Sequence, residues 1–211
     1  MKKMLLFFTM ATLYISSIGQ KSADYGNDFE FSTTKDDGNK KFIKYTAVSL
    51  GYSQWNTDVD ELTKFTTQKN QAFHFVWEGY NTFSKKLAGS TQAKISYLKN
   101  KDFMIGVDYG IYLIIFKGLY LKASIGYGSL FNKATDGSPY IFTYGGEGGY
   151  LFKIKSGEGK RPFYIALFGG YQGYSGNEYD SYTDYTNTFS GRGPGGGLKF
   201  MWGPKPVTSS N

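Results

Sequence analysis

The 211-residue chain contains no cysteine. A disulfide framework, a lipid-modified N-terminal cysteine and a thiolate metal site are therefore excluded. His74 is the only histidine, so a site with several histidine ligands is excluded as well, and acidic side chains are the ligands left for a metal. Stability must come from backbone hydrogen bonding and from packing.

Long apolar runs are also scarce, and the one at the N-terminus is short. Two lysines precede the run MLLFFTMATLYI, and small residues follow it. This is the layout of a secretory signal peptide, and the run is shorter than the roughly 20 residues that a spanning helix needs. We expect residues 1–19 to be cleaved near Gly19 or Gln20 and the mature chain to be exported.

The formal net charge is +7, and it falls to +5 once Lys2 and Lys3 are removed with the signal peptide. On an exported chain this moderate excess does not indicate a nucleic-acid partner. The N-terminal part of the mature chain, residues 20–40, is rich in Asp, Ser, Thr, Asn and Lys. Such a composition predicts a flexible segment.

Beyond residue 40, apolar and polar residues alternate in long stretches separated by polar or glycine-rich breaks. A period of two is typical of β-strands rather than of helices. Most stretches exceed the five or six residues of an ordinary strand and match the roughly 9–11 or more residues that cross a bilayer at a tilt. The pattern predicts eight strands, at 42–54, 71–84, 88–98, 103–115, 118–131, 139–155, 161–175 and 190–203.

The connections between these strands alternate in length, as they do in bacterial membrane barrels with short periplasmic turns and longer outer loops. An even number of strands also returns the C-terminus to the periplasm. Only the connection at 99–102 is unexpectedly short for an outer loop. We expect outer loops at 55–70, 99–102, 132–138 and 176–189, and inner turns at 85–87, 116–117 and 156–160.

Each predicted strand has one apolar face and one face that carries about one charge among small residues. Asp108, for example, lies between Gly106 and Gly110, while the residues on either side of it in the sequence are apolar. A face in water would carry many lysines and glutamates, whereas eight strands leave a bore that side chains fill. The pattern favours a membrane barrel with a polar lumen. A soluble exported β-barrel or sandwich is the alternative.

The central charges alternate in sign along the chain. Opposite charges on neighbouring antiparallel strands stabilise the pairing of those strands. Gly145, Gly149 and Gly170 would leave room in the lumen for the longer charged and aromatic side chains. We expect an ion-paired network inside the barrel, formed by Glu78, Lys94, Asp108, Lys122, Glu147 and Lys199.

With these features the chain resembles the small eight-stranded outer-membrane barrels of Gram-negative bacteria, of the OmpX and opacity-protein type. The resemblance covers residues 42–203 and rests on the signal peptide, the eight amphipathic segments, the many aromatic residues and the polar lumen. Many such proteins end on an aromatic residue used in assembly, whereas this chain continues past Trp202 as GPKPVTSSN. The resemblance implies a monomeric, antiparallel, up-and-down transmembrane barrel in the bacterial outer membrane.

Taken together, the chain divides into a signal peptide at 1–19, a flexible periplasmic segment at 20–40, an outer-membrane barrel at 41–203 and a tail at 204–211. Outer-membrane lipids are the expected partner. Lysines at an interface reach toward phosphate headgroups while their stems cover apolar surface. Such basic residues gather beside the inner turns, at Lys85, Lys86, Lys117, Lys153, Lys155, Lys160 and Arg161.

The outer loop at 176–189 interleaves carboxylates with tyrosines. Tyrosine offers contact area at low entropic cost, and carboxylates bind calcium, although no EF-hand pattern is present. A solvated loop that keeps the barrel mouth polar is the simpler interpretation, and binding of a surface ligand or cell-envelope partner is the alternative. Neither a metal nor a cofactor is predicted. The residues for surface binding are Glu178, Tyr179, Asp180, Tyr182, Asp184 and Tyr185.

Residues for a chemical reaction are sparse. A lipid-modifying hydrolase would need His74 as base, Glu78 as its orienting group and Ser49 or Ser53 as nucleophile. Four strand residues span roughly 13 Å, too far for the hydrogen bond that such a triad needs. We predict a non-enzymatic barrel with a filled polar lumen and a structural or surface-interaction role. A narrow channel or small-ligand transporter is the alternative, and the hydrolase is the third hypothesis.

Overall fold

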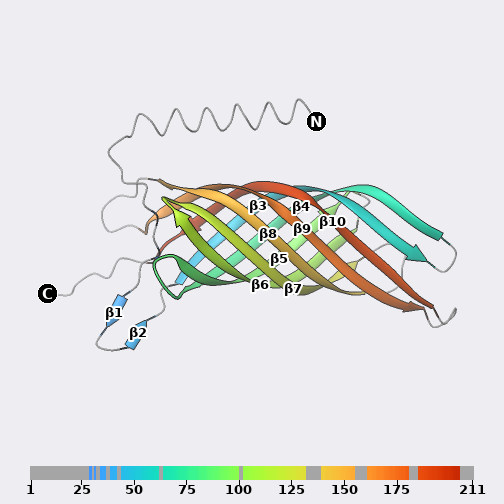
Figure 1. Ribbon diagram of the computed structural model, residues 1–211, viewed down its shortest axis with the longest axis horizontal. Coiled ribbons are helices and arrows are strands. Elements are labelled where there is room, and N and C mark those ends of the chain that lie inside the picture. Colours follow the sequence, from blue (N-terminus) through green and yellow to red (C-terminus); the bar gives the residue numbers. More distant parts are fainter. Residues whose placement is uncertain are drawn as a thin grey trace, which may run out of the picture.

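The structure is a computed structural model that describes residues 29, 31, 34–36, 39–41, 44–61, 64–99, 102–131, 139–154, 161–180 and 185–204. Eight of its strands close into an antiparallel barrel in which each strand pairs with the next and β10 pairs with β3 (Figure 1). A separate hairpin consists of β1 (Thr34–Asp36) and β2 (Asn39–Lys41). The barrel strands are β3 (Lys44–Glu61), β4 (Lys64–Thr82), β5 (Leu87–Leu98), β6 (Phe103–Phe116), β7 (Leu119–Phe131), β8 (Tyr140–Ile154), β9 (Phe163–Asp180) and β10 (Tyr185–Trp202).

All eight predicted strands are present, which confirms the predicted closed eight-stranded antiparallel barrel. The strands differ from the prediction where they leave the apolar region. Most of the expected loops at 55–70 and 176–189 is paired strand, because β3 and β4 continue to Glu61 and Lys64, and β9 and β10 to Asp180 and Tyr185. These ends were missed because most of their residues are polar on both faces, and a strand of that kind shows little alternation.

The strands have unequal lengths, and this makes one end of the barrel asymmetric. β3, β4, β9 and β10 have 18 or 19 residues, whereas β5, β6 and β7 have 12 to 14. Because β10 pairs with β3, the two long hairpins stand side by side as a four-stranded wall (Figure 1). We call this the outer end, following the orientation expected from the sequence, and the opposite end the inner end.

The inner end carries the short turns. Lys117 and Gly118 form a two-residue turn with φ of 43° and 89°, the left-handed conformation that tight hairpin turns require. A Cβ atom at Gly118 would lie 2.6 Å from the carbonyl oxygen of Leu151, so only glycine fits here. The turn expected at 156–160 lies outside the described residues, as do Lys155 and Lys160. The other basic residues expected here are exposed: Lys85, Lys86, Lys117, Lys153 and Arg161.

Burial alternates along the barrel strands, and the apolar face is on the outside. On β6, Tyr109 and Ile111 are about 60 % exposed, whereas Asp108 and Tyr112 are buried. An apolar surface of this extent is a liability in water and is the lipid-facing band of a membrane barrel. The barrel therefore spans a membrane. Other side chains of this band are Phe73, Phe75, Trp77, Ile95, Ile105, Val107, Leu121, Ile125 and Leu198.

Two residues of the segment at 20–40 lie inside the inner end of the barrel. Phe29 and Phe31 are 5 % and 1 % exposed and pack against tyrosines of the barrel wall. This placement differs from the flexible segment expected from the sequence. The polar composition of the whole segment hides a short alternation, Asp28-Phe29-Glu30-Phe31-Ser32, that places two aromatic rings on one face.

In the part of the chain that the structure describes, no helix is long and apolar enough to cross a membrane.

Candidate functional site

The lumen is the candidate site, and its side chains form three layers. Buried apolar and aromatic residues form a cluster at each end, and a charged layer lies between them. We call the layer at the inner end the inner cluster; its barrel residues are Tyr45, Ala47, Tyr80, Ala88, Tyr112, Ile114, Tyr120, Leu151, Tyr164, Ala166 and Met201. The outer cluster consists of Trp55, Ala72, Leu98, Met104, Leu130, Ile141 and Tyr174.

The six charged residues singled out in the sequence all lie in the middle layer. Glu78 Oε1 lies 2.5 Å from Lys122 Nζ, and Glu78 Oε2 lies 3.4 Å from Lys199 Nζ. Glu147 pairs with the same two lysines, so these four residues form a ring of alternating charge. Lys94 and Asp108 form a separate pair at 3.6 Å.

From the sequence we expected each ion pair to join two neighbouring strands, and only some of the observed ion pairs do so. Lys122 and Glu147 face each other in the β7–β8 register, and Lys94 and Asp108 lie on the neighbouring strands β5 and β6. The other contacts cross the lumen, since Lys199 on β10 reaches Glu78 on β4 and Glu147 on β8. In so narrow a bore, inward side chains from strands that are not neighbours meet near the axis.

Lys199 is the most enclosed cation of the ring, at 1 % exposure. Its Nζ lies 5.4 Å, 5.2 Å and 5.5 Å from the ring centroids of Tyr112, Tyr120 and Phe168. An ammonium group over an aromatic face is attracted by the ring quadrupole, and the attraction grows when water is excluded. The inner cluster and the charged layer are therefore one connected structure.

Glycines on the lumen face make room for this layer. A Cβ atom at Gly170 would lie 2.8 Å from the Cα atom of Glu147, and one at Gly126 would lie 2.4 Å from Asp108 Oδ1 and 2.2 Å from the carbonyl oxygen of Val107. No side chain fits at these positions without displacing a charged residue or the neighbouring strand.

The substitution Gly126→Ala should therefore lower the free energy of unfolding by about 1–3 kcal/mol, as overpacking does elsewhere. Gly79→Ala is the matched control, because a Cβ atom there meets nothing within 4 Å. Urea unfolding of the barrel in lipid vesicles measures both. Equal effects of the two substitutions would show that the lumen around Asp108 is looser than described.

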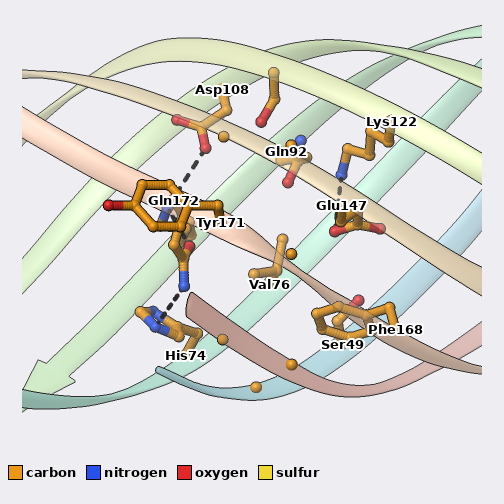
Figure 2. A pocket seen from close by; sticks show the side chains of 18 of the residues that line it. Ser49, His74, Val76, Gln92, Asp108, Lys122, Glu147, Phe168, Tyr171 and Gln172 are labelled. Carbon is orange, nitrogen blue, oxygen red and sulfur yellow. Dashed lines mark hydrogen bonds and ion pairs between the residues drawn. The ribbon is translucent and has the colours of Figure 1, made fainter. Parts of the chain in front are cut away.

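A hydrogen-bonded chain connects the charged layer to His74. Lys94 Nζ donates to Gln172 Oε1 at 3.4 Å, and the Gln172 amide nitrogen donates to His74 Nε2 at 2.8 Å (Figure 2). Ser53 Oγ also lies 2.6 Å from Nε2, and Ser96 Oγ lies 2.7 Å from Nδ1. The three side chains that contact the imidazole nitrogens are thus neutral, and Lys94 reaches the ring only through the Gln172 amide.

The hydrolase triad weighed from the sequence does not form. Ser53 does contact His74, but the second imidazole nitrogen faces Ser96 rather than a carboxylate. Glu78 instead accepts a hydrogen bond from Tyr80 at 2.5 Å and pairs with lysines. His74 is also buried in the lumen, against the ring of Trp55, and away from lipid. These positions give no support to a lipid-modifying reaction.

The middle layer borders a partly open cavity of about 70 Å³. Figure 2 shows its charged wall, with Lys122 pointing to Glu147, and its far wall at His74 and Gln172. Two buried neutral groups of its lining, Ser49 Oγ and Gln92 Nε2, have no hydrogen-bond partner among the described residues. Val76 and Phe168 add apolar surface. No sequence pattern indicated this cavity, because its volume depends on how side chains from many strands meet.

The surface-binding residues proposed from the sequence are only partly described. The backbones of Glu178, Tyr179 and Asp180 pair with those of Asn187, Thr186 and Tyr185 at the tip of the β9–β10 hairpin. Tyr182 and Asp184 lie outside the described residues. Where the structure describes the chain, no group of three or more metal-ligating side chains could hold an ion.

No known protein family matches the sequence, and no curated protein matches it. Among solved structures, the outer membrane protein AlkL, determined in lipid bilayers, is 10 % identical, covers 84 % of this chain and 97 % of its own, and has a TM-score of 0.48. OprG from Pseudomonas aeruginosa is 10 % identical over 80 % of this chain and 99 % of its own, with a TM-score of 0.39. A de novo designed transmembrane β-barrel is 11 % identical over 81 % and 99 %, with a TM-score of 0.31.

Similarities this distant do not allow the function of this chain to be inferred. The more specific resemblance to the OmpX and opacity-protein type stays a prediction. The assignment rests on the molecule itself. A closed ring of eight strands, a lipid-facing apolar band and a polar lumen are the properties of barrels in the bacterial outer membrane. The chain is a small outer-membrane β-barrel.

Proposed function

We propose that the barrel is a narrow outer-membrane passage that takes a small uncharged molecule through its lumen. The observation that carries this proposal is the cavity in the middle layer, where Ser49 Oγ and Gln92 Nε2 lack partners among the described residues. A buried polar group left unpaired costs about 1–3 kcal/mol, so a molecule that pairs with these groups gains affinity there. Val76 and Phe168 suit an apolar part of the same molecule.

The charges of the lumen favour a neutral ligand. The three lysines of the network are balanced by its three carboxylates, and each carboxylate has a lysine within 4 Å. Selective ion pathways use rings of charge of one sign, and this lumen has none in its described part. A water molecule needs about 10–15 Å³ of such a cavity, so about 70 Å³ holds only a few non-hydrogen atoms.

The passage is closed at rest. The inner and outer clusters lie on either side of the cavity, so we expect a ligand to pass only when side chains of these clusters move. Such a barrel should conduct ions poorly while it admits small neutral solutes. This behaviour separates it from an open pore and from a barrel that serves only as a scaffold.

The test is solute uptake by lipid vesicles that contain the folded barrel. Small uncharged solutes such as urea and glycerol should enter faster than charged solutes of similar size. Val76→Phe fills the cavity and should reduce uptake to the level of protein-free vesicles. Val48→Phe is the control, because Val48 lies on the opposite, lipid-facing side of β3 and should leave uptake unchanged. Uptake that is unaffected by Val76→Phe would reject the proposal.

A surface-interaction role is the second candidate, and the wall formed by the two long hairpins favours it. Connecting segments on a rigid scaffold are free to meet partners. Deletion of residues 178–187 shortens the β9–β10 hairpin but leaves the strands within the lipid-facing band paired. The deleted barrel should still insert and shift on a gel after boiling, while adhesion of cells that display it disappears. Unchanged adhesion would remove this candidate.

A further inference from the structure

The inner end of the barrel holds the aromatic pair Phe29 and Phe31 in a defined pocket. The Phe29 ring lies 4.8 Å from that of Tyr164, and the Phe31 ring lies 5.3 Å from Tyr45 and 5.8 Å from Tyr112, all edge to face. Edge-to-face pairs contribute about 0.5–1.5 kcal/mol each beyond the area that they bury. With Tyr80, whose ring is tilted against Phe31, four tyrosines from β3, β4, β6 and β9 line the pocket.

The backbone of Phe31 is bound as well. The amide N–H of Phe31 donates to the carbonyl oxygen of Lys85, in the turn between β4 and β5, at 2.8 Å. Adding an extended segment to a free backbone group, with alternate side chains in pockets, is a common way to bind a peptide. Here the pockets accept residues two apart, which places both rings on the same face of the segment.

The segment is not part of the barrel that it enters. The eight barrel strands close into a ring without it, and the β1–β2 hairpin that follows it forms a two-stranded sheet of its own among the described strands. In Figure 1 this hairpin lies beyond the inner end of the barrel. Phe29 and Phe31 can therefore leave their pocket without breaking any pairing between barrel strands.

The pocket leads directly to the charged layer. Phe31 packs against Tyr80 and Tyr112. Tyr80 donates its hydroxyl hydrogen to Glu78, and the Tyr112 ring lies under Lys199. One layer of aromatic rings thus separates the segment from the cavity proposed to take the ligand.

We propose that the inner mouth of the barrel is a peptide-binding site for an extended Phe-x-Phe segment, and that Phe29 and Phe31 occupy it as an exchangeable stopper of the lumen. The binding site does not depend on the proposed transport, whereas the stopper role rests on it. When the segment leaves, the inner cluster loses its cover and the lumen becomes accessible from the inner side.

The chain has no cysteine, so a single introduced thiol reports accessibility without background. Ala47→Cys is suitable, because Ala47 is fully buried in the inner cluster between Tyr45 and Ser49. In barrels held in lipid nanodiscs, a water-soluble maleimide should label this thiol slowly. The double variant Phe29→Ala/Phe31→Ala should be labelled about tenfold faster or more. Without the two rings, the free energy needed to open the inner end of the barrel is smaller, so the end opens more often. Phe116→Ala, at an exposed position of the same end, should change nothing.

A peptide with the sequence of residues 27–33, NDFEFST, tests recognition directly. It should slow labelling of the Phe29→Ala/Phe31→Ala barrel again, whereas NDAEAST should not. A fluorescent NDFEFST should bind this variant more tightly than the barrel whose own segment is in place. For each variant, a difference in gel mobility between boiled and unboiled samples shows that the barrel is folded. Equal labelling of all folded variants, or equal protection by both peptides, would overturn the proposed site.

Uptake by vesicles separates this inference from the proposed transport. If NDFEFST binds and slows labelling, and the Phe29→Ala/Phe31→Ala barrel takes up neutral solutes faster, both the site and its stopper role hold. If the peptide binds but uptake never exceeds that of protein-free vesicles in any variant, the binding site holds and the transport proposal is rejected, and the stopper role with it.

Discussion

Replacement of Lys199 by methionine should lower the free energy of unfolding by about 3–5 kcal/mol, the cost of breaking a buried ion pair by removing one partner. Lys199 is 1 % exposed and pairs with both Glu78 and Glu147. Without it, Lys122 remains as the only lysine of the ring, and one carboxylate is left uncompensated where water is excluded.

Urea unfolding in lipid vesicles provides the measurement. The double variant Lys199→Met/Glu147→Gln restores a neutral ring and should regain part of the loss, because the two sites share one network. Lys153→Met, at an exposed position of β8, should change stability by less than about 0.5 kcal/mol. Strictly additive effects of the two ring substitutions would show that the ion pairs do not stabilise the barrel together.

Ile111→Arg should cost about 2–4 kcal/mol, the value for an arginine on the lipid face near the middle of a membrane barrel. Ile111 is 60 % exposed on β6, so the same change in a water-soluble barrel would be nearly neutral. The large expected effect comes entirely from the surrounding lipid.

Thr67→Arg is the matched control for Ile111→Arg. Thr67 is also exposed, but it lies on the part of β4 that extends beyond its pairing with β5. It should change stability by less than about 0.5 kcal/mol. Equal and small effects at both positions would mean that the apolar band does not face lipid.

The strands and the residues of the charged layer could be predicted from the sequence because both depend on local alternation. Each strand in the apolar band has one face in lipid and one in the lumen, so a period of two marks it directly. Asp108 and Lys122 stand out because they are single charges on faces of small residues. The sign alternation singled out six side chains, and the structure places all of them in the ion pairs of the charged layer.

Which residues of the charged layer pair with each other could not be predicted from their order along the sequence. Lys199 and Glu78 lie on strands that are neighbours of β3 and not of each other, and only the closure of the ring brings them together. The cavity has the same origin, since residues such as Ser49, Gln92 and Gln172 come from three different strands.

Two further features were missed for different reasons. The outer parts of β3, β4, β9 and β10 are mostly polar on both faces, with only isolated apolar residues such as Trp55 and Phe189, so the sequence does not clearly separate them from loops. Phe29 and Phe31 form a pattern of only two apolar residues. Nothing in the neighbouring sequence indicates that they bind in a pocket formed by tyrosines of distant strands.

Fluorescence of single-tryptophan variants tests the central claim, that the apolar face contacts lipid and the polar face lines the lumen. Trp77 is 61 % exposed on the outside of β4, and Trp55 is 1 % exposed inside the barrel. In vesicles of brominated phosphatidylcholine, the variant Trp55→Phe/Trp202→Phe should lose most of the emission of Trp77. The variant Trp77→Phe/Trp202→Phe should keep most of the emission of Trp55. If Trp55 were quenched and Trp77 were not, the face assigned to the lumen would be the one that contacts lipid. If neither tryptophan were quenched, the barrel would not span the membrane as described.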